Sequence, residues 1–169
     1  MYAALVLTVS DRSWRGERED LGGPAVASFL QGNGFSVVRS EVVPDDRPAI
    51  VRALRQGIAD DIPLIVTTGG TGFSLRDVTP EATLDVLERR ADGLAEHMRR
   101  QSQEKTRFAL LSRSVCGTAG RTLVVNLPGS PTGACESLES ILAVIPHALK
   151  LLRSDDVADA EHRLGDQEV

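Results

Sequence analysis

The segment Leu64-Ile-Val-Thr-Thr68 runs directly into the glycine-rich segment Gly69-Gly-Thr-Gly72, and this pair of segments is the clearest indication of the fold class. A short apolar run that ends in turn residues is typical of a strand buried on both faces of a parallel sheet. Three other segments have strand character, the last of them with the mixed composition of a strand nearer an edge: Tyr2 to Val9, Leu123 to Leu127 and Phe35 to Val43. The sequence therefore predicts a sheet that contains these four strands.

Helical segments separate the predicted strands. Apolar residues recur in them at helical spacing, as Ile50, Leu54 and Ile58 do. The predicted helices are Gly23 to Gln31, Pro48 to Ala59, Pro80 to Arg90, Gly93 to Gln103 and Pro131 to Leu152. Strands that alternate with helices imply right-handed crossovers, so the predicted fold class is α/β, a three-layer α/β/α sandwich around a mostly parallel sheet.

The composition is that of one soluble domain. The chain has 169 residues, of which 41% are hydrophobic and 25% are charged. A chain of this size buries a core without metal or disulfide staples, so we expect residues 1–152 to form a single domain and the acidic segment 153–169 to be a flexible tail. No apolar run approaches the ~20 residues of a membrane span. Met1 leads into the first strand without a signal-peptide pattern, so we expect a cytoplasmic protein.

Several classes of function are disfavoured. The formal net charge of −5 argues against broad, charge-driven binding to nucleic acid. His97, His147 and His162 are scattered without metal-ligand spacing, so a zinc site is not expected. Cys116 and Cys135 are expected to be reduced and structural.

Unusual sequence is concentrated where the predicted strands end. The segments concerned are Ser10-Asp-Arg-Ser13, Pro44-Asp-Asp46, Gly69-Gly-Thr-Gly72 and Asn126-Leu-Pro-Gly-Ser-Pro131. Ligands of open α/β sheets bind at the carboxyl ends of the strands. We therefore expect these four segments to form one site.

The glycine-rich segment is the sharpest of these features. Glycines let backbone amides approach an anion closely, and Thr79 as N-cap before Pro80 predicts a helix start nearby. Both features favour phosphate binding. A tight turn without a ligand is an equally good interpretation of the three glycines taken alone.

Further residues at the same edge also fit an anion. Ser130-Pro131 predicts a second helix start, for which simple capping is the alternative. Guanidinium groups of Arg12, Arg76 and Arg113 would clamp phosphate bidentately, and surface solvation is the alternative for each of them.

Two aspartates indicate a metal ion. Asp45 and Asp77 lie in loops at the predicted site, and carboxylates beside bound phosphates commonly hold Mg²⁺. Turn chemistry is the alternative, and it is the interpretation that we adopt for Asp46.

Three motifs carry a resemblance to a known family: Thr67-Thr-Gly-Gly-Thr-Gly72, Arg76-Asp-Val-Thr-Pro-Glu-Ala-Thr83 and Asn126-Leu-Pro-Gly-Ser-Pro131. With them the chain closely resembles the molybdopterin adenylyltransferase family, which covers bacterial molybdenum cofactor biosynthesis proteins and the G domain of gephyrin-type proteins. The resemblance extends from about Ala4 to Leu152. It implies a homotrimer that activates molybdopterin with Mg-ATP to give adenylylated molybdopterin and pyrophosphate.

The resemblance also implies roles for individual residues. Asp45 and Asp77 match the two functional aspartates of the family, so we assign both to catalysis and to the Mg²⁺ ion. The residues assigned to substrate binding, from the resemblance and from the loop chemistry above, are Ser10, Asp11, Arg12, Thr68, Gly69, Gly70, Thr71, Gly72, Arg76, Ser112, Arg113, Pro128, Gly129 and Ser130.

Three hypotheses about function remain at this point. The chain transfers an adenylyl group from ATP to molybdopterin, or it is a carrier module that binds molybdopterin without transfer, or it is a trimeric interaction platform with a vestigial pocket. The intact Asp45, Asp77 and glycine turn favour the first of these. The implied partners are ATP, molybdopterin, further copies of the chain and a molybdate-inserting protein that receives the product, with no nucleic acid and no membrane.

Overall fold

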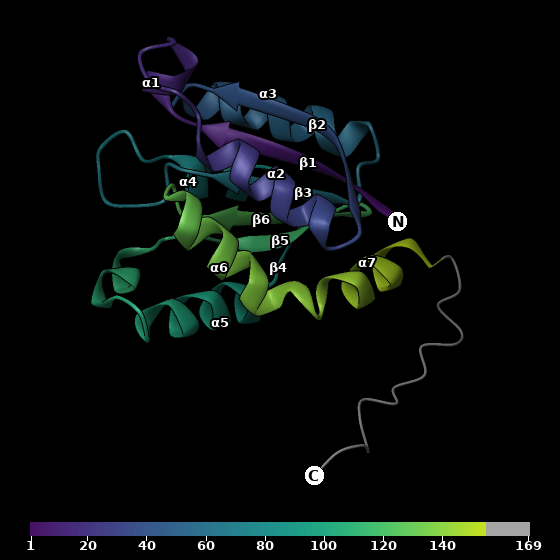
Figure 1. Cartoon of the computed structure of the whole chain (residues 1–169). Coiled ribbons are helices and arrows are strands. Elements are labelled where there is room, and N and C mark those ends of the chain that lie inside the picture. Colours follow the sequence, from purple (N-terminus) through teal and green to yellow (C-terminus); the bar gives the residue numbers. More distant parts are fainter. Residues whose placement is uncertain (155–169) are drawn as a thin grey trace.

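A six-stranded sheet forms the centre of the protein in a computed structural model, of which we describe residues 1–154 (Figure 1). The strand order is β2-β1-β3-β6-β5-β4. The strands are β1 Tyr2–Val9, β2 Phe35–Val43, β3 Leu64–Thr68, β4 Arg89–Arg90, β5 Cys116–Ala119 and β6 Thr122–Leu127. β1, β2, β3 and β6 run parallel, while β5 is antiparallel to β6 and β4 is antiparallel to β5. The sheet is therefore mixed, with a parallel majority.

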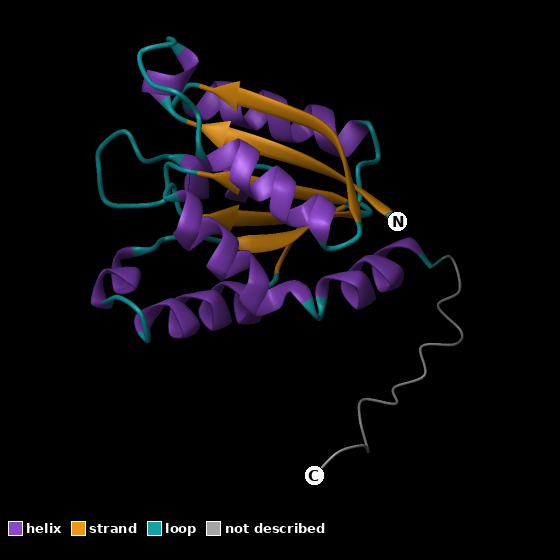
Figure 2. Ribbon diagram, in the orientation of Figure 1, coloured by secondary structure: helices purple, strands orange, loops and turns teal. Residues whose placement is uncertain are grey.

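Helices cover both faces of this sheet (Figure 2). They are α1 Asp11–Trp14, α2 Gly22–Gly32, α3 Arg47–Ala59, α4 Thr79–Leu84, α5 Asp92–Gln103, α6 Pro131–Leu142 and α7 Ile145–Arg153, with a 3₁₀ turn η1 at Arg107–Leu111. One hydrophobic core contains residues of α2, α5, α6 and α7, and a second contains residues of α3 and α4. The predicted three-layer α/β/α architecture is thus confirmed.

The two cores follow from the alternation of side chains along each strand. In β1, Ala4 and Val6 point into the core under α2 and α6, whereas Leu5 and Leu7 point into the core under α3. All four are at most 1% exposed. A strand covered on both faces has no solvent-facing positions, which is why these strands are apolar throughout rather than alternating.

The helix predicted from Pro80 to Arg90 is wrong in its second half. The helix α4 ends at Leu84, and Arg89–Arg90 forms the edge strand β4 instead. The backbone amides of Glu88 and Ala91 donate to carbonyls of β5, at 2.9 and 2.8 Å. Pairing with β5 satisfies these groups in place of further helical hydrogen bonds.

The single helix predicted from Pro131 to Leu152 is two helices. α6 ends at Leu142 and α7 begins at Ile145. Pro146 explains the break, because it lacks the amide hydrogen for a bond to Leu142 and its ring would clash with that carbonyl.

Two smaller expectations also change. Thr79 is not the N-cap of α4, because Val78 holds that position, and the Thr79 hydroxyl donates instead to the Gly69 carbonyl at 2.9 Å. Arg153, which was placed in the tail, is the last residue of α7. The rest of the predicted tail from residue 155 lies outside the described residues. Within residues 1–154, no helix is both long and apolar enough to cross a membrane.

Candidate functional site

The carboxyl ends of the parallel strands meet at one edge of the sheet. The register pairs Val9 with Val43, and Thr68 with both Thr8 and Leu127. The four loops predicted to form a site therefore start side by side, at the end to which the strand arrows point in Figure 1. This confirms the expectation that the strand-end segments lie together.

The glycine turn after β3 requires glycine at two positions. Gly69 has φ of 102°, and a Cβ there would lie 2.3 Å from the Val9 carbonyl oxygen. Gly70 has φ of 64°, and its Cβ would lie 2.3 Å from the Thr79 hydroxyl. Both are left-handed conformations that favour glycine. The turn is consequently pressed against the end of β1 and the start of α4.

The turn after β6 touches the glycine turn. A Cβ on Gly129 would lie 3.3 Å from the Gly69 Cα, and the Gly69 amide donates to the Leu127 carbonyl at 3.3 Å. Ser130 caps α6 as predicted, because its side chain accepts a hydrogen bond from the Gly133 amide at 3.1 Å. Two glycine-containing turns thus form a shared floor at the centre of the site.

Two cavities open on either side of this floor. The first has a volume of about 430 Å³ and lies against α5, η1 and α6; among the predicted residues it is lined by Thr71, Gly72, Ser112 and Pro128. The second has a volume of about 780 Å³ and lies against the loop after β1; among the predicted residues it is lined by Ser10, Asp11, Arg12, Asp45, Thr68 and Gly69. The residues that line both cavities are Gly70, Asp77, Gly129 and Ser130.

Two predicted residues line neither cavity. The guanidinium of Arg113 donates to the carbonyls of Gly72 and Asp77, at 2.7 and 2.6 Å, and pairs with Glu81. Arg76 pairs with Asp11 at 2.8 Å. Both arginines thereby brace the loop that carries Asp77, whereas Arg12 lines the second cavity as expected.

The carboxylates at the site influence one another. Asp45 Oδ2 accepts the Asp11 amide at 2.7 Å, and Asp11 Oδ1 accepts the Asp45 amide at 3.0 Å. Burial raises the pKa of Asp45, and the nearby Asp11 and Asp77 carboxylates raise it further. Partial burial also acts to raise the pKa of Asp11, but hydrogen bonds from Arg76 and from the Asp45 amide bring it below its ordinary value.

This pattern of charge fits a divalent cation. Asp45 and Asp77 are close enough to repel each other, and oxygen ligands from one or two carboxylates are what Mg²⁺ takes from a protein beside phosphates. A protein-only cage is not present, since no cluster of three or more His, Cys, Asp or Glu residues with metal-binding geometry occurs among the described residues. Two carboxylates alone leave room for phosphate oxygens and water around the ion.

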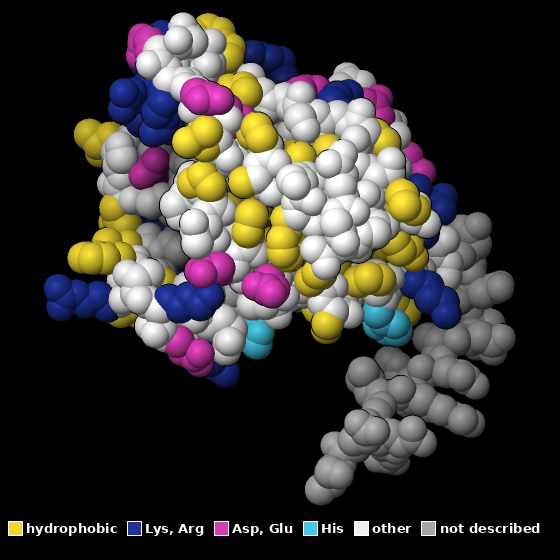
Figure 3. All heavy atoms as spheres, viewed as in Figure 1, with side chains coloured by type: hydrophobic (Ala, Val, Ile, Leu, Met, Phe, Trp, Pro, Cys, Tyr) yellow, Lys and Arg dark blue, Asp and Glu magenta, His cyan; other side chains and the backbone are white. Residues whose placement is uncertain are grey.

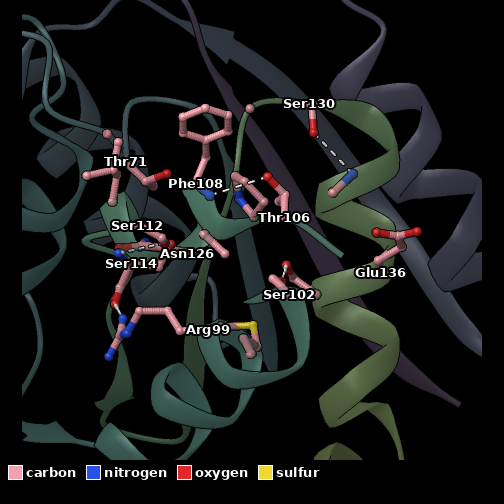
Figure 4. Close-up of a pocket in the computed structure, with 18 of the residues that line it drawn as sticks. Thr71, Arg99, Ser102, Thr106, Phe108, Ser112, Ser114, Asn126, Ser130 and Glu136 are labelled. Atoms are coloured by element: carbon pink, nitrogen blue, oxygen red, sulfur yellow. Dashed lines mark hydrogen bonds between the residues drawn. The ribbon is translucent and has the colours of Figure 1, made fainter. Parts of the chain in front are cut away.

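Sequence reasoning missed the wall of the first cavity and part of the second. Met98, Lys105, Phe108 and Glu136 line the first cavity, and they come from α5, the following loop, η1 and α6. Figure 4 labels Phe108 and Glu136 among the lining residues. None of these residues belongs to a motif. Apolar residues at helical spacing predict which face of a helix is buried, but they do not predict which other elements that face packs against. Arg15 and Arg18 of the second cavity follow Arg12 closely, but Glu17, Glu19 and Asp20 lie among them, so the sequence does not stand out as a basic cluster.

Comparison with known proteins matches this arrangement to one family. Residues 5–147 match the family model described as a probable molybdopterin binding domain. The molybdenum cofactor synthesis protein cinnamon of Drosophila melanogaster is 42% identical over 156 residues, which are 90% of this chain and 26% of that protein. The chain therefore corresponds to about a quarter of that longer relative.

Shorter relatives match nearly end to end. A molybdopterin adenylyltransferase of Helicobacter pylori J99 is 38% identical over 151 residues, which are 87% of this chain and 85% of that protein. The crystal structure of the molybdopterin biosynthesis enzyme MoaB from Thermus thermophilus is 50% identical, with a TM-score of 0.85, over 90% of this chain and 96% of that one.

Proposed function

The chain belongs to the family of molybdopterin-binding domains of molybdenum cofactor biosynthesis, and from this premise we propose that it is a molybdopterin adenylyltransferase. It transfers AMP from Mg-ATP to the terminal phosphate of molybdopterin and releases pyrophosphate. The main support is that the two cavities share one floor, which is formed by Gly70, Asp77, Gly129 and Ser130. Such a site lets two phosphorylated ligands meet at their phosphates.

The reaction requires little covalent chemistry from the protein. A phosphate monoester is mostly dianionic at neutral pH, so its oxygen attacks the α-phosphorus of ATP without a general base. The new P–O bond forms as the bond from the α-phosphorus to the bridging oxygen breaks, and pyrophosphate leaves with the electron pair. None of the described residues that line the two cavities is a histidine, which accords with this scheme.

Positioning and charge then supply the catalysis. Asp45 and Asp77 would hold the Mg²⁺ ion, which would neutralise the gathered phosphate charge. The exposed Arg12 and Arg18 line the second cavity and attract the triphosphate of ATP, together with Arg15, which also pairs with Glu17 at 2.7 Å. Figure 3 shows basic side chains gathered at the upper left, over the end of the molecule where β1 and β2 terminate.

The test is release of pyrophosphate. The protein is incubated with molybdopterin, ATP and Mg²⁺, and release that depends on all three is the expected result. No release, while a known family enzyme is active in the same buffer, would contradict the proposal. Calorimetric binding of molybdopterin without any ATP-dependent product would identify a carrier module instead.

We further propose that the chain is a homotrimer that hands its product to a molybdate-inserting partner. Support comes from large apolar side chains on the surface around the site, with Phe73, Leu75, Phe108 and Leu110 between 65% and 99% exposed. Burial of such side chains against another copy is favourable. Sedimentation equilibrium is expected to give three times the mass of the chain, and a stable monomer would refute the proposal.

A further inference from the structure

The loop between β3 and α4 carries Asp77 and has little packing of its own. In Figure 1 it extends away from the sheet beside α4. Phe73 and Leu75 in this loop are 69% and 99% exposed. Arg76 pairs with Asp11, but pairs of an exposed arginine contribute little to stability. The position of the loop therefore depends mainly on the hydrogen bonds at its base.

Arg113 holds the base of this loop. Its backbone amide donates to the Thr71 carbonyl at 2.9 Å. Its Nε donates to the Gly72 carbonyl at 2.7 Å, and its Nη2 donates to the Asp77 carbonyl at 2.6 Å. Its Nη1 pairs with Oε1 of Glu81. One guanidinium thus joins both ends of the loop to the first turn of α4.

Glu81 fixes the direction in which this guanidinium points. Among the described residues, Glu81 is the only carboxylate that pairs with Arg113. Although 37% of the Glu81 side chain is exposed, its Oε2 atom is buried and has no hydrogen-bond partner within residues 1–154. The charges of Arg113 and Glu81 are therefore compensated mainly by each other. Without the carboxylate, the guanidinium is free to turn toward another anion, such as a phosphate.

The loop held in this way places the Asp77 carboxylate against the glycine turn. A Cβ on Gly72 would lie 2.9 Å from Asp77 Oδ2, and the Ser74 amide donates to the same oxygen at 2.8 Å. Asp77 lines both cavities, whereas Glu81 lines neither. Any effect of Glu81 on a ligand therefore passes through Arg113 and Asp77. Mg²⁺ demands near-ideal octahedral geometry, so a small displacement of a carboxylate ligand weakens its binding.

We propose that Glu81 is a positioning residue for the metal-bound nucleotide. By orienting Arg113 it keeps Asp77 in place, and it thereby sets the affinity of the site for Mg-ATP but not its affinity for molybdopterin. This inference rests on the proposed function. Molybdopterin that binds without a divalent cation does not use the Asp77 carboxylate as a metal anchor, so its affinity does not depend on how exactly that carboxylate is placed.

Binding of Mn²⁺-ATP to Glu81→Gln tests this role. Mn²⁺ prefers the same oxygen ligands as Mg²⁺, and its effect on the relaxation of water protons reports binding without any adenylyl transfer. The amide keeps the shape of the side chain but loses the charge that holds the guanidinium. We expect the Kd for Mn²⁺-ATP to rise about fivefold or more, and the Kd for molybdopterin, measured by calorimetry without metal, to change less than about twofold.

Asp85→Asn is the matched control. Asp85 follows the last residue of α4 and pairs with Arg47 through two contacts of 2.7 Å, and neither residue lines a cavity. The substitution breaks an arginine–carboxylate pair and removes the same charge, but it leaves the base of the Asp77 loop intact. We expect it to bind Mn²⁺-ATP as wild type does. Equal weakening in Asp85→Asn and Glu81→Gln overturns the proposal, because the effect would then be one of general charge.

The variant Arg113→Met shows whether Glu81 acts through Arg113. Groups that act as a unit are not additive, so we expect Glu81→Gln to cause no further loss of Mn²⁺-ATP affinity in the Arg113→Met background. A further loss of the same size overturns the proposal. A lower Kd for Mn²⁺-ATP in Glu81→Gln overturns it also, because Arg113 would then have turned to the phosphates. If Arg113→Met does not fold, the comparison of Glu81→Gln with Asp85→Asn decides.

The readouts separate this role from a structural one and from the proposed function. An equal loss of affinity for molybdopterin and Mn²⁺-ATP in Glu81→Gln would show a structural role only. If the wild type releases no pyrophosphate, the proposed reaction fails, while selectively weaker Mn²⁺-ATP binding by Glu81→Gln still supports the role of Glu81. If pyrophosphate is released and both proteins bind Mn²⁺-ATP equally, the reaction stands and the role of Glu81 is refuted.

Discussion

Asp11 and Asp45 each accept a hydrogen bond from the other's backbone amide, at 3.0 and 2.7 Å, across the ends of β1 and β2. The exchange fixes both loops to each other through the two aspartate side chains. It also leaves Asp45 Oδ1 facing the glycine turn, since a Cβ on Gly70 would lie 3.2 Å from that oxygen. The Asp45 carboxylate is therefore already oriented before a ligand binds. In this position it is partly buried beside the carboxylates of Asp11 and Asp77, which destabilises its charged form.

Stability measurements on Asp45→Asn should reveal this cost. Burial raises the pKa of Asp45, so the folded state binds a proton more tightly than the unfolded state does. The stabilisation that this proton contributes is fully present below the pKa that Asp45 has in the unfolded chain. It is lost as the pH rises through the higher pKa that Asp45 has in the folded protein. Without Mg²⁺, we expect Asp45→Asn to unfold at higher urea than wild type at neutral pH, with the gap closing toward about pH 4. A gap that is constant with pH would contradict this prediction.

A pair of glycine substitutions should separate backbone strain from steric clash. Gly34 and Gly69 both have positive φ, of 84° and 102°. Nothing lies within 4 Å of a Cβ on Gly34, whereas one on Gly69 would lie 2.3 Å from the Val9 carbonyl oxygen. We expect Gly34→Ala to lower the free energy of unfolding by about 1–2 kcal/mol, the usual cost of the left-handed region. Gly69→Ala should lower the free energy of unfolding distinctly more than Gly34→Ala does, as measured by urea denaturation. Equal losses in the two variants would argue against a steric clash between a Cβ at position 69 and the Val9 carbonyl.

Arg113→Lys should weaken the loop that carries Asp77. One ammonium cannot reproduce the planar fork that contacts Gly72, Asp77 and Glu81. We expect a loss of about 1–3 kcal/mol in the free energy of unfolding and a lower kcat for adenylyl transfer. Arg52→Lys, at an exposed position of α3, is the matched control and should change neither. Unaltered stability of Arg113→Lys would mean that its contacts contribute nothing net.

The parallel strands were predictable because they are buried on both faces. β1, β3 and β6 read as continuous apolar runs, and their register brings the predicted loops to one edge. β4 and β5 are different, since they have two and four residues and little apolar character. β4 can pair with β5 because Gly117 admits the β4 backbone, where a Cβ would lie 2.4 Å from the Arg89 carbonyl oxygen. No local pattern encodes that close approach.

The site was predictable where it consists of strand ends and not where it depends on helix packing. Asp45 and Asp77 follow strands or turns with recognisable chemistry, and both line the second cavity. Phe108 and Glu136 meet across the first cavity only because α5, η1 and α6 pack together. Arg113 was assigned to phosphate, but in the structure its guanidinium donates to backbone carbonyls. The sequence shows that an arginine is present to donate hydrogen bonds, but it does not show which acceptors the guanidinium contacts.

The two cysteines should differ in reactivity toward iodoacetamide. Burial raises the pKa of the Cys116 thiol to about 12, and the side chain is fully buried in β5. Burial also raises the pKa of Cys135, which is only half-buried. Since the thiolate is the reactive form, we expect mass spectrometry to detect slow labelling of Cys135 in the native protein, and labelling of Cys116 only after unfolding. Prompt native labelling of Cys116 would contradict its placement.

The sharpest test of the proposed function is Asp77→Asn. The Ser74 amide donates to Asp77 Oδ2 at 2.8 Å, a bond that an asparagine carbonyl can also accept, and Arg113 holds the Asp77 backbone carbonyl. The substitution therefore preserves the loop and removes the negative charge that Mg²⁺ requires. We expect normal unfolding and molybdopterin binding, with adenylyl transfer reduced about a hundredfold or more, the scale of losing one preorganised electrostatic group.

Asp46→Asn is the matched control for that experiment. Asp46 is exposed and caps α3 by accepting the Ala49 amide at 3.0 Å, which asparagine also does well. Its pyrophosphate release should be close to that of wild type, because neither cavity is lined by Asp46. If Asp77→Asn turns over at the wild-type rate, Asp77 does not anchor a metal ion and has only a structural role in its loop. The same conclusion follows if its loss of activity parallels unfolding measured by circular dichroism. Equal losses in both variants would show that the assay responds to general negative charge near β2 rather than to an anchored metal ion.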